Sequence, residues 1–96
     1  MRITIDGNTI GSEADFHDAL AKILDLGDFY GRNLNALWDR LTADVDRPLE
    51  IVWINASESK KNLGDIQDKI AELFRDVEAH DRGLNFSERF QFSFVD

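Results

Sequence analysis

The feature that most constrains the fold is a short apolar run directly after the only proline of the chain. Residues Leu49–Ile54, which follow Pro48, are apolar at every position except Glu50. A strand with apolar side chains on both faces is typical of a parallel sheet covered by helices, whereas a strand with one face in water alternates apolar and polar residues. The run therefore predicts a buried β-strand of an α/β protein.

Two further segments have the alternation expected of strands. Ile3 and Ile5 alternate with polar residues near the N-terminus, and a turn is expected at 6–8. Near the other end of the chain, three phenylalanines alternate with other residues within 90–95. Together with the apolar run, these segments predict a sheet of three strands.

Helical periodicity fills most of the chain between the predicted strands. Apolar residues recur at three- and four-residue spacing over about 13–25, about 33–43 and about 65–81. Residues 55–64 are polar and are expected to form a connection with room for one helical turn. The order β-α-α-β-α-β requires helical crossovers between parallel strands. We therefore predict the α/β class, with a small three-stranded parallel β-sheet and three to four helices packed on it, in a single domain over 1–96.

Residues near the ends of the predicted helices favour the same boundaries. Ser12, followed three residues later by Asp15, resembles a capping box at a helix start. Gly27 stands where a glycine just past a helix end is expected, and Asn33 can cap the second helix. The local signals thus agree with the periodicity.

The composition excludes several classes of function. The 96 residues include no cysteine, 19 Asp plus Glu and 11 Lys plus Arg, for a net charge of −8. Without cysteine there is no disulfide, thiol nucleophile or cysteine-ligated zinc site, and no cofactor or metal is expected. An acidic surface repels nucleic acids and anionic membranes but attracts a basic partner. The first residues lack the apolar region of a secretory signal, so we expect a soluble cytoplasmic protein.

Few residues are candidates for catalysis. The sequence has no nucleophile elbow, phosphate-binding loop or dinucleotide-binding motif. The histidines, His17 and His80, fall on the polar faces of the first and last predicted helices, where we expect them to be solvated. Asp44 and Asp46 lack the pattern of a calcium loop and are interpreted as charged loop residues. We therefore predict that the protein is not an enzyme.

The second predicted helix carries a strip of polar residues beside its apolar stripe. At about 100° per residue, Asn35, Asp39 and Thr42 fall in one sector, with Trp38 at its border. Tyr30, just before the helix, is expected at the same surface. The strip offers an amide, a carboxylate and a hydroxyl to a partner. Periodicity alone favours a plainer interpretation, an amphipathic helix whose polar residues are simply solvated.

A resemblance to a known family lies in the segment Tyr30-Gly31-x-Asn33-Leu34-x-Ala36-Leu37-Trp38-Asp39-x-Leu41-Thr42. This segment is similar to the signature of the barstar family, intracellular inhibitors of the secreted ribonuclease barnase. Similarity extends over residues 1 to about 80 and includes Asp15-Phe16-His17 and the strand that contains Trp53. The resemblance implies an α/β fold in which the helix at about 33–43, with the loop before it, plugs a ribonuclease active site.

The resemblance also implies which residues bind the ribonuclease. Asp39 corresponds to the central carboxylate of the family, which mimics an RNA phosphate in a cationic pocket. The other partner-binding positions that it implies are Asn35, Trp38, Thr42, Tyr30, Gly31, Asn33, Phe29 and Asp76. Such an inhibitor is expected to be an immunity protein of a toxin–antitoxin pair. It is expected to be a monomer when free and to bind a basic, barnase-like ribonuclease 1:1, without direct contact with nucleic acid or membrane.

Three of these positions differ from the family prototype. Asn35 replaces an aspartate, Phe29 replaces a tyrosine, and Asp76 replaces a glutamate. The changes remove one charge, one hydroxyl and some side-chain reach, so each could change which ribonuclease is bound. They also keep open a second class of function, an acidic protein-binding module for another basic partner without ribonuclease inhibition.

Overall fold

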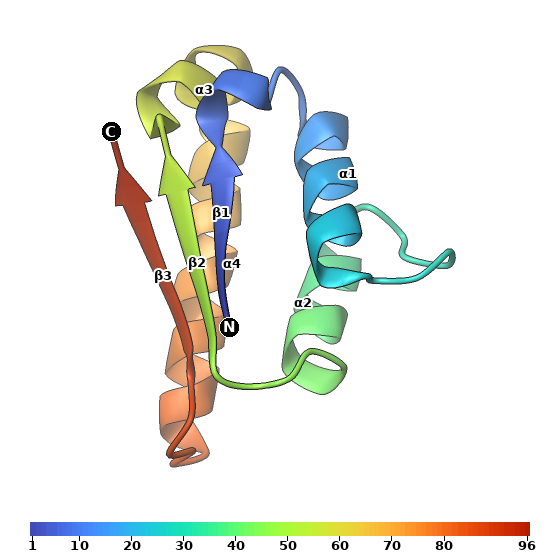
Figure 1. Ribbon diagram of the computed structural model, residues 1–96, viewed down its shortest axis with the longest axis vertical. Helices are drawn as coiled ribbons and strands as arrows, with labels where there is room; N and C mark the ends of the chain where they lie inside the picture. The colour runs from blue at the N-terminus through green and yellow to red at the C-terminus, as the bar shows by residue number, and fades with distance from the viewer.

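Three parallel strands form the sheet of the protein (Figure 1). The structure, a computed structural model, describes all residues 1–96. The strands β1 (Arg2–Asp6), β2 (Leu49–Ile54) and β3 (Phe90–Val95) lie in the order β1-β2-β3, and both strand pairs are parallel. The apolar run is thus the central strand, and the predicted α/β class is confirmed.

Helices cover only one face of this sheet. Ile51 and Trp53 of β2 point into the core. Val52 points to the opposite face, where its neighbours in register are Thr4 and Ser93. That face is turned to the viewer in Figure 1 and carries no helix. Val52 is 4% exposed, so the strand is buried on both faces as predicted, although helices cover only one face of the sheet.

Four α-helices pack behind, beside and at the end of the sheet (Figure 1). They are α1 (Glu13–Leu24), α2 (Leu34–Ala43), α3 (Ala56–Leu63) and α4 (Asp65–Gly83), and a 3₁₀ turn, η1, covers Gly7–Thr9. α4 packs along β3 and also against α2. The long helix ends two residues later than predicted, and the number of helices agrees with the predicted three to four.

The segment 55–64 differs from its prediction, because it contains the eight-residue helix α3. The buried residues of this helix recur at helical spacing and are Ala56, Ser59 and Leu63. The Ser59 hydroxyl donates to Oε1 of Gln67 at 2.6 Å and accepts from Nε1 of Trp53 at 3.0 Å. The inward face of α3 is therefore small and partly polar, so apolar periodicity does not indicate this helix.

The ends of α1 agree with the sequence signals only in part. The Ser12 hydroxyl accepts the N–H of Asp15 at 3.1 Å, but the Asp15 carboxylate accepts the N–H of Gly11 at 2.9 Å and so does not complete the predicted box. At the other end, Asp25 rather than Gly27 is the left-handed C-cap, with φ of 53°. Gly27 also has a positive φ, of 85°, but it lies in the following loop.

One cluster of 18 buried residues joins the sheet to the helices. Trp53 of β2 stacks on Phe16 of α1, with ring centroids 5.3 Å apart. Phe74 of α4 packs on Phe90 and Phe92 of β3 at 5.7 and 4.8 Å. These aromatic contacts fix α1 and α4 against the sheet, and the packing of α2 on α4 then places α2.

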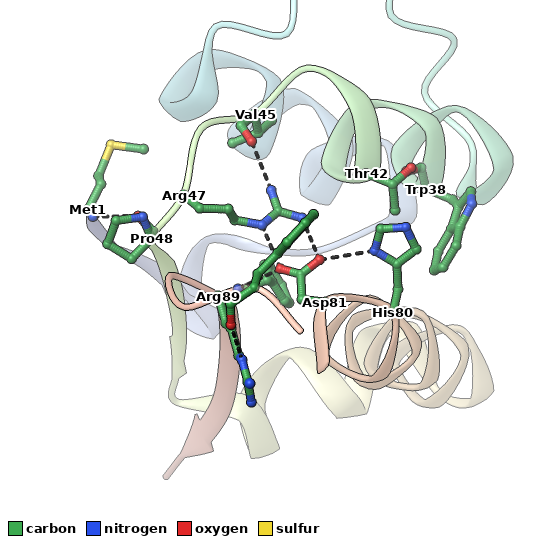
Figure 2. Close-up of polar contacts among 11 residues, drawn as sticks. Met1, Trp38, Thr42, Val45, Arg47, Pro48, His80, Asp81 and Arg89 are labelled. Atoms are coloured by element: carbon green, nitrogen blue, oxygen red, sulfur yellow. Dashed lines mark hydrogen bonds and ion pairs between the residues drawn. The ribbon is translucent and has the colours of Figure 1, made fainter. Parts of the chain in front are cut away.

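A buried ion pair ties the connection between α2 and β2 to the end of α4 (Figure 2). Arg47 donates from Nε and Nη2 to the Asp81 carboxylate at 2.6 and 3.1 Å, and Asp81 also accepts the N–H of Phe90 at 2.8 Å. The Asp81 side chain is fully buried. Burial acts to raise its pKa, but hydrogen bonds from Arg47, His80 and Phe90 outweigh burial and lower the pKa to about 2. The carboxylate is therefore ionised and holds three chain segments together.

Candidate protein-binding surface

α2 presents two polar side chains to solvent, one helical turn apart. The helix begins after Asn33, whose Oδ1 accepts the N–H of Ala36 at 2.8 Å, and the predicted cap is confirmed. Asn35 and Asp39 follow at a spacing of four residues, which places them on one side of the helix. Both are exposed, as is Asn33. The central carboxylate implied by the resemblance thus faces solvent.

Trp38 and Thr42 form the border between this polar strip and the core. Both are half-buried. The Thr42 hydroxyl donates to the Trp38 carbonyl at 2.7 Å, so its hydrogen is used within the helix and only its oxygen lone pairs remain for a partner. The indole of Trp38 meets the ring of His80 edge-on, with centroids 5.6 Å apart and planes at 83° (Figure 2). The surface therefore continues from α2 onto α4.

On α4, Asp76 lies one turn before His80 and is exposed. The spacing of four residues places both on one side of the helix. His80 makes no hydrogen bond to Asp76, and its Nδ1 lies 3.0 Å from Oδ1 of Asp81 instead. The expectation of a solvated His80 is therefore wrong in part, because the side chain is 28% exposed and packs between Trp38 and Asp81.

The loop before α2 exposes one aromatic side chain to solvent. Phe29 is 94% exposed. Gly31 has no positive φ, but a Cβ atom at this position would lie 3.2 Å from Cβ of Ala36, so glycine allows the loop to pack on the start of α2. Arg32 has a φ of 51°, and its Nε donates to Asp18 of α1 at 2.7 Å. The loop is thus held against α1 and α2 while Phe29 stands free.

Tyr30 is buried rather than at the surface, which corrects the sequence prediction. It is 3% exposed, and its hydroxyl lies 2.6 Å from Nδ1 of His17. The expectation of a solvated His17 is wrong as well, because this side chain is 1% exposed and its Nε2 lies 3.1 Å from Oε2 of Glu13. Burial holds the pKa of the Tyr30 hydroxyl above its ordinary value. The hydroxyl therefore keeps its proton and can donate to Nδ1, while the Nε2–H of a neutral His17 donates to Glu13.

The negative charges on this surface are not neutralised within the chain. Asp39 and Asp76 take part in none of its ion pairs. Arg32 and Arg40, the cations close to Asp39 in the sequence, are each paired with another aspartate, and Arg75, which precedes Asp76, is in no ion pair with it. The surface therefore has an excess of negative charge, which favours a cationic partner.

Sequence reasoning missed Asp81 and the burial of His17, although both have a signal in the helical phase. Asp81 continues the buried stripe of α4, which includes Ile70, Phe74 and Val77. His17 shares its side of α1 with Leu20 and Leu24, three and seven residues later. A polar residue at an apolar phase position is thus the pattern that marks a buried hydrogen-bonded group in this chain.

The surface has no pocket, and no three His, Asp or Glu side chains gather as a possible metal site. None of the helices combines the length and the apolar character that crossing a membrane would need.

Comparison with protein families gives a match over nearly the whole chain. Residues 1–93 match the family described as Barstar (barnase inhibitor). The chain belongs to the barstar family. It is also 42% identical over 77 residues to the candidate ribonuclease inhibitor YrdF of Bacillus subtilis (strain 168), a match that covers 80% of this chain and 85% of that protein.

The barstar match confirms the resemblance and extends it. It continues through α4 and most of β3, beyond the region of about 80 residues that carried the similarity in the sequence. The family is described as a barnase inhibitor and the relative as a candidate ribonuclease inhibitor, so both descriptions are of inhibitors rather than enzymes. The prediction that this protein is an inhibitor without an enzymatic activity of its own is therefore confirmed.

Proposed function

We propose that this barstar-family protein inhibits a basic, barnase-like ribonuclease by placing α2 and the loop before it in the active site, where Asp39 takes the position of an RNA phosphate. The observation that carries the proposal is the exposed carboxylate of Asp39, unpaired within the chain, on a short capped helix of a protein with net charge −8. The relative YrdF is itself described as a candidate ribonuclease inhibitor.

The physical basis is the similarity between a carboxylate and a phosphate. A ribonuclease binds RNA phosphate through cationic donors, and a carboxylate accepts charge-assisted hydrogen bonds from the same groups. The Asn33 cap fixes the start of α2, and the contact of Trp38 with His80 fixes its middle against α4. A carboxylate on such a stiff support loses little conformational freedom on binding, so more of the electrostatic attraction remains as affinity.

The three predicted partner-binding positions that differ from the family prototype bear on the choice of target. Asn35 offers an uncharged amide, so the facing position of the ribonuclease has no need of a cation. Phe29 offers an apolar ring without a hydroxyl and is 94% exposed, so an apolar contact suits it. Asp76 extends the acidic surface onto α4 with a short side chain. We propose that these three positions select a cognate ribonuclease other than barnase.

The biological role follows from the proposed target. A free ribonuclease in the cytoplasm would degrade the RNA of the cell, so the inhibitor acts there as the immunity protein of a toxin–antitoxin pair. The chain offers one such surface on α2, so we propose a monomer when free and a 1:1 complex with the ribonuclease.

An RNA-cleavage assay with a barnase-like ribonuclease tests this function. Cleavage should stop at one equivalent of inhibitor. Asp39→Asn should weaken binding by about 2–5 kcal/mol, because it leaves the facing cations buried without their counter-charge. Glu88→Gln removes the same charge from an exposed residue without an ion pair and should change the affinity by less than about 0.5 kcal/mol.

Two results would contradict the proposal in different ways. Equal effects of Asp39→Asn and Glu88→Gln would show that net charge matters and that the site is elsewhere. Tight binding to a basic protein with no loss of RNA cleavage would favour the alternative function, an acidic module for another basic partner.

A further inference from the structure

Two large apolar side chains are exposed on the turn between α4 and β3. Leu84 is 55% exposed and Phe86 is 39% exposed. In Figure 1 this turn lies at the lower end of the molecule, as does the C-terminal end of α2. Single exposed apolar residues are common on protein surfaces, but these two lie two residues apart on a turn of fixed geometry.

Hydrogen bonds hold the backbone of this turn. The N–H of Asn85 donates to the carbonyl of Arg82 at 2.9 Å, and the N–H of Phe86 donates to the carbonyl of Asp81 at 3.2 Å. Together with the φ of 57° at Asn85, these bonds form a Schellman motif, which brings Phe86 beside the last turn of the helix. Nε of Arg89 also donates to the carbonyl of Phe86 at 2.6 Å. Both backbone polar groups of Phe86 are therefore bonded, and its ring is exposed on a rigid support.

Leu84 continues the side of α4 that carries Asp76. Its N–H donates to the carbonyl of His80 at 3.1 Å, so Leu84 keeps the helical spacing and lies one turn after His80, just as His80 lies one turn after Asp76. The ring of His80 meets the indole of Trp38 on α2, with centroids 5.6 Å apart (Figure 2). The end of α4 is thus continuous with the surface of α2.

The apolar pair lies close to the acidic strip on the scale of a protein–protein interface. Leu84 is about 6 Å beyond His80 along α4, the rise of four helical residues. A standard interface covers about 800 Å² on each partner, which is a patch about 30 Å across. A ribonuclease centred on Asp39 and Trp38 therefore reaches the end of α4.

The end of α4 fits a different part of the ribonuclease than Asp39 does. Leu84 and Phe86 offer apolar surface, and the neighbouring guanidinium of Arg89 is in no ion pair. A cationic cleft is unsuited to this surface, because Arg89 would repel its charges and the apolar side chains would strip them of water. The matching surface is apolar and lies beside the cleft.

We propose that Leu84 and Phe86 form a second contact with the ribonuclease, an apolar anchor that packs on apolar side chains beside the cationic cleft. This inference rests on the proposed function. An apolar contact on a rigid support adds affinity at a small cost in conformational entropy. Asp39 then recognises the site where the ribonuclease binds RNA phosphate, and the end of α4 adds selection by the shape of an apolar surface outside that site.

Binding kinetics test the proposal on the ribonuclease that the wild-type protein inhibits in the cleavage assay. Leu84→Gln and Phe86→Gln should each bind about fivefold more weakly, because each removes apolar area from the contact. The loss should lie in the dissociation rate, since the net charge that steers association is unchanged. Leu84→Met stays apolar and should bind like the wild type. Val95→Thr is the matched control, because Val95 is 48% exposed at the other end of β3, and it should also bind like the wild type.

A second measurement uses the unaltered protein. A soluble paramagnetic agent broadens the NMR signals of methyl groups that are in contact with solvent. The methyl signals of Leu84 should be broadened in the free protein and protected in the complex, whereas those of Val95 should be broadened in both.

The outcomes separate this inference from the function on which it rests. Equal affinity of Leu84→Gln, Phe86→Gln and the wild type, or broadened Leu84 signals in the complex, would overturn the inference and leave the inhibition standing. Unchanged affinity with a lower mass of free Leu84→Gln in light scattering would overturn it in favour of a contact between copies of this chain. Absence of both binding and inhibition by the wild type would overturn the proposed function as well.

Discussion

The hydroxyl of Tyr30 and Nδ1 of His17 lie 2.6 Å apart inside the protein, and their contact joins the loop before α2 to α1. His17 extends the connection to Glu13, whose carboxylate lies 3.1 Å from Nε2. The neighbouring Phe29 is 94% exposed. Of these two adjacent aromatic residues, Tyr30 is thus buried and anchors the loop, whereas Phe29 is exposed to solvent.

Replacing Tyr30 with phenylalanine should lower the free energy of unfolding by about 1–3 kcal/mol, because Nδ1 of His17 then stays buried without a hydrogen-bond donor. Urea unfolding at neutral pH measures the change. Ser93→Ala is the control, because it removes an exposed hydroxyl from β3 and should have an effect of less than about 0.5 kcal/mol. A Tyr30→Phe protein as stable as the wild type would show that this hydrogen bond does not anchor the loop.

The low pKa of Asp81 predicts a loss of stability in acid. Its pKa is about 2 in the folded protein, against an ordinary value of 3.8 that applies to the unfolded chain. The ionised carboxylate therefore stabilises the fold above the ordinary value, and this contribution disappears as the pH falls from about 5 toward 2. The difference in pKa corresponds to about 2 kcal/mol. Unfolding free energies measured across this range should show the loss.

The variant Asp81→Asn separates this carboxylate from all other acids of the chain. At neutral pH it should cost about 3–5 kcal/mol, because Arg47 stays largely buried without its counter-charge. Between about pH 5 and 2 it should then lose less stability than the wild type, since the titrating group is gone. An equal acid-dependent loss in both proteins would assign the effect to other carboxylates.

The elements whose inward faces are large and apolar could be predicted from the sequence. The run Leu49–Ile54 and the phenylalanines of β3 gave the right strands, because their pattern reflects the packing that buries them. α3 was predicted only as a connection with room for one helical turn, since Ser59 is held in the core by hydrogen bonds to Trp53 and Gln67, and such bonds have no signature in hydropathy. The open face of the sheet was missed for a related reason, because the central position of Val52 buries it without a covering helix.

The candidate site, too, could be predicted only in part from the sequence. The exposure of Asp39 followed from helical phase, which is a local property. The burial of Tyr30 depends on His17, 13 residues away, and that of Asp81 depends on Arg47, 34 residues away. Pairs of this kind form only after the fold brings distant segments together. The resemblance implies that Tyr30 binds the partner, but only the three-dimensional contacts show that its side chain points inward.

Acidic side chains of α4 lie at the edge of the sheet that β3 forms. β3 pairs only with β2, so its other side is a free edge. Two carboxylates of α4 occupy that edge: Asp81 accepts the N–H of Phe90 at 2.8 Å, and Glu78 accepts the N–H of Phe92 at 3.2 Å. An open edge offers unpaired N–H groups to a strand of another molecule, and charged side chains at an edge oppose such pairing.

Removing one of these carboxylates should therefore promote self-association. Glu78→Ala frees the N–H of Phe92 and deletes a charge beside it, while Asp81 still protects Phe90. The apparent mass in size-exclusion chromatography with light scattering should rise toward that of a dimer as the concentration increases. Glu72→Ala is the matched control, because Glu72 is an exposed acid of the same helix without a hydrogen bond to β3, and its mass should match the wild type. If Glu78→Ala behaves like Glu72→Ala at every concentration, the carboxylate does not protect the edge, and the twist of β3 or its short length must do so instead.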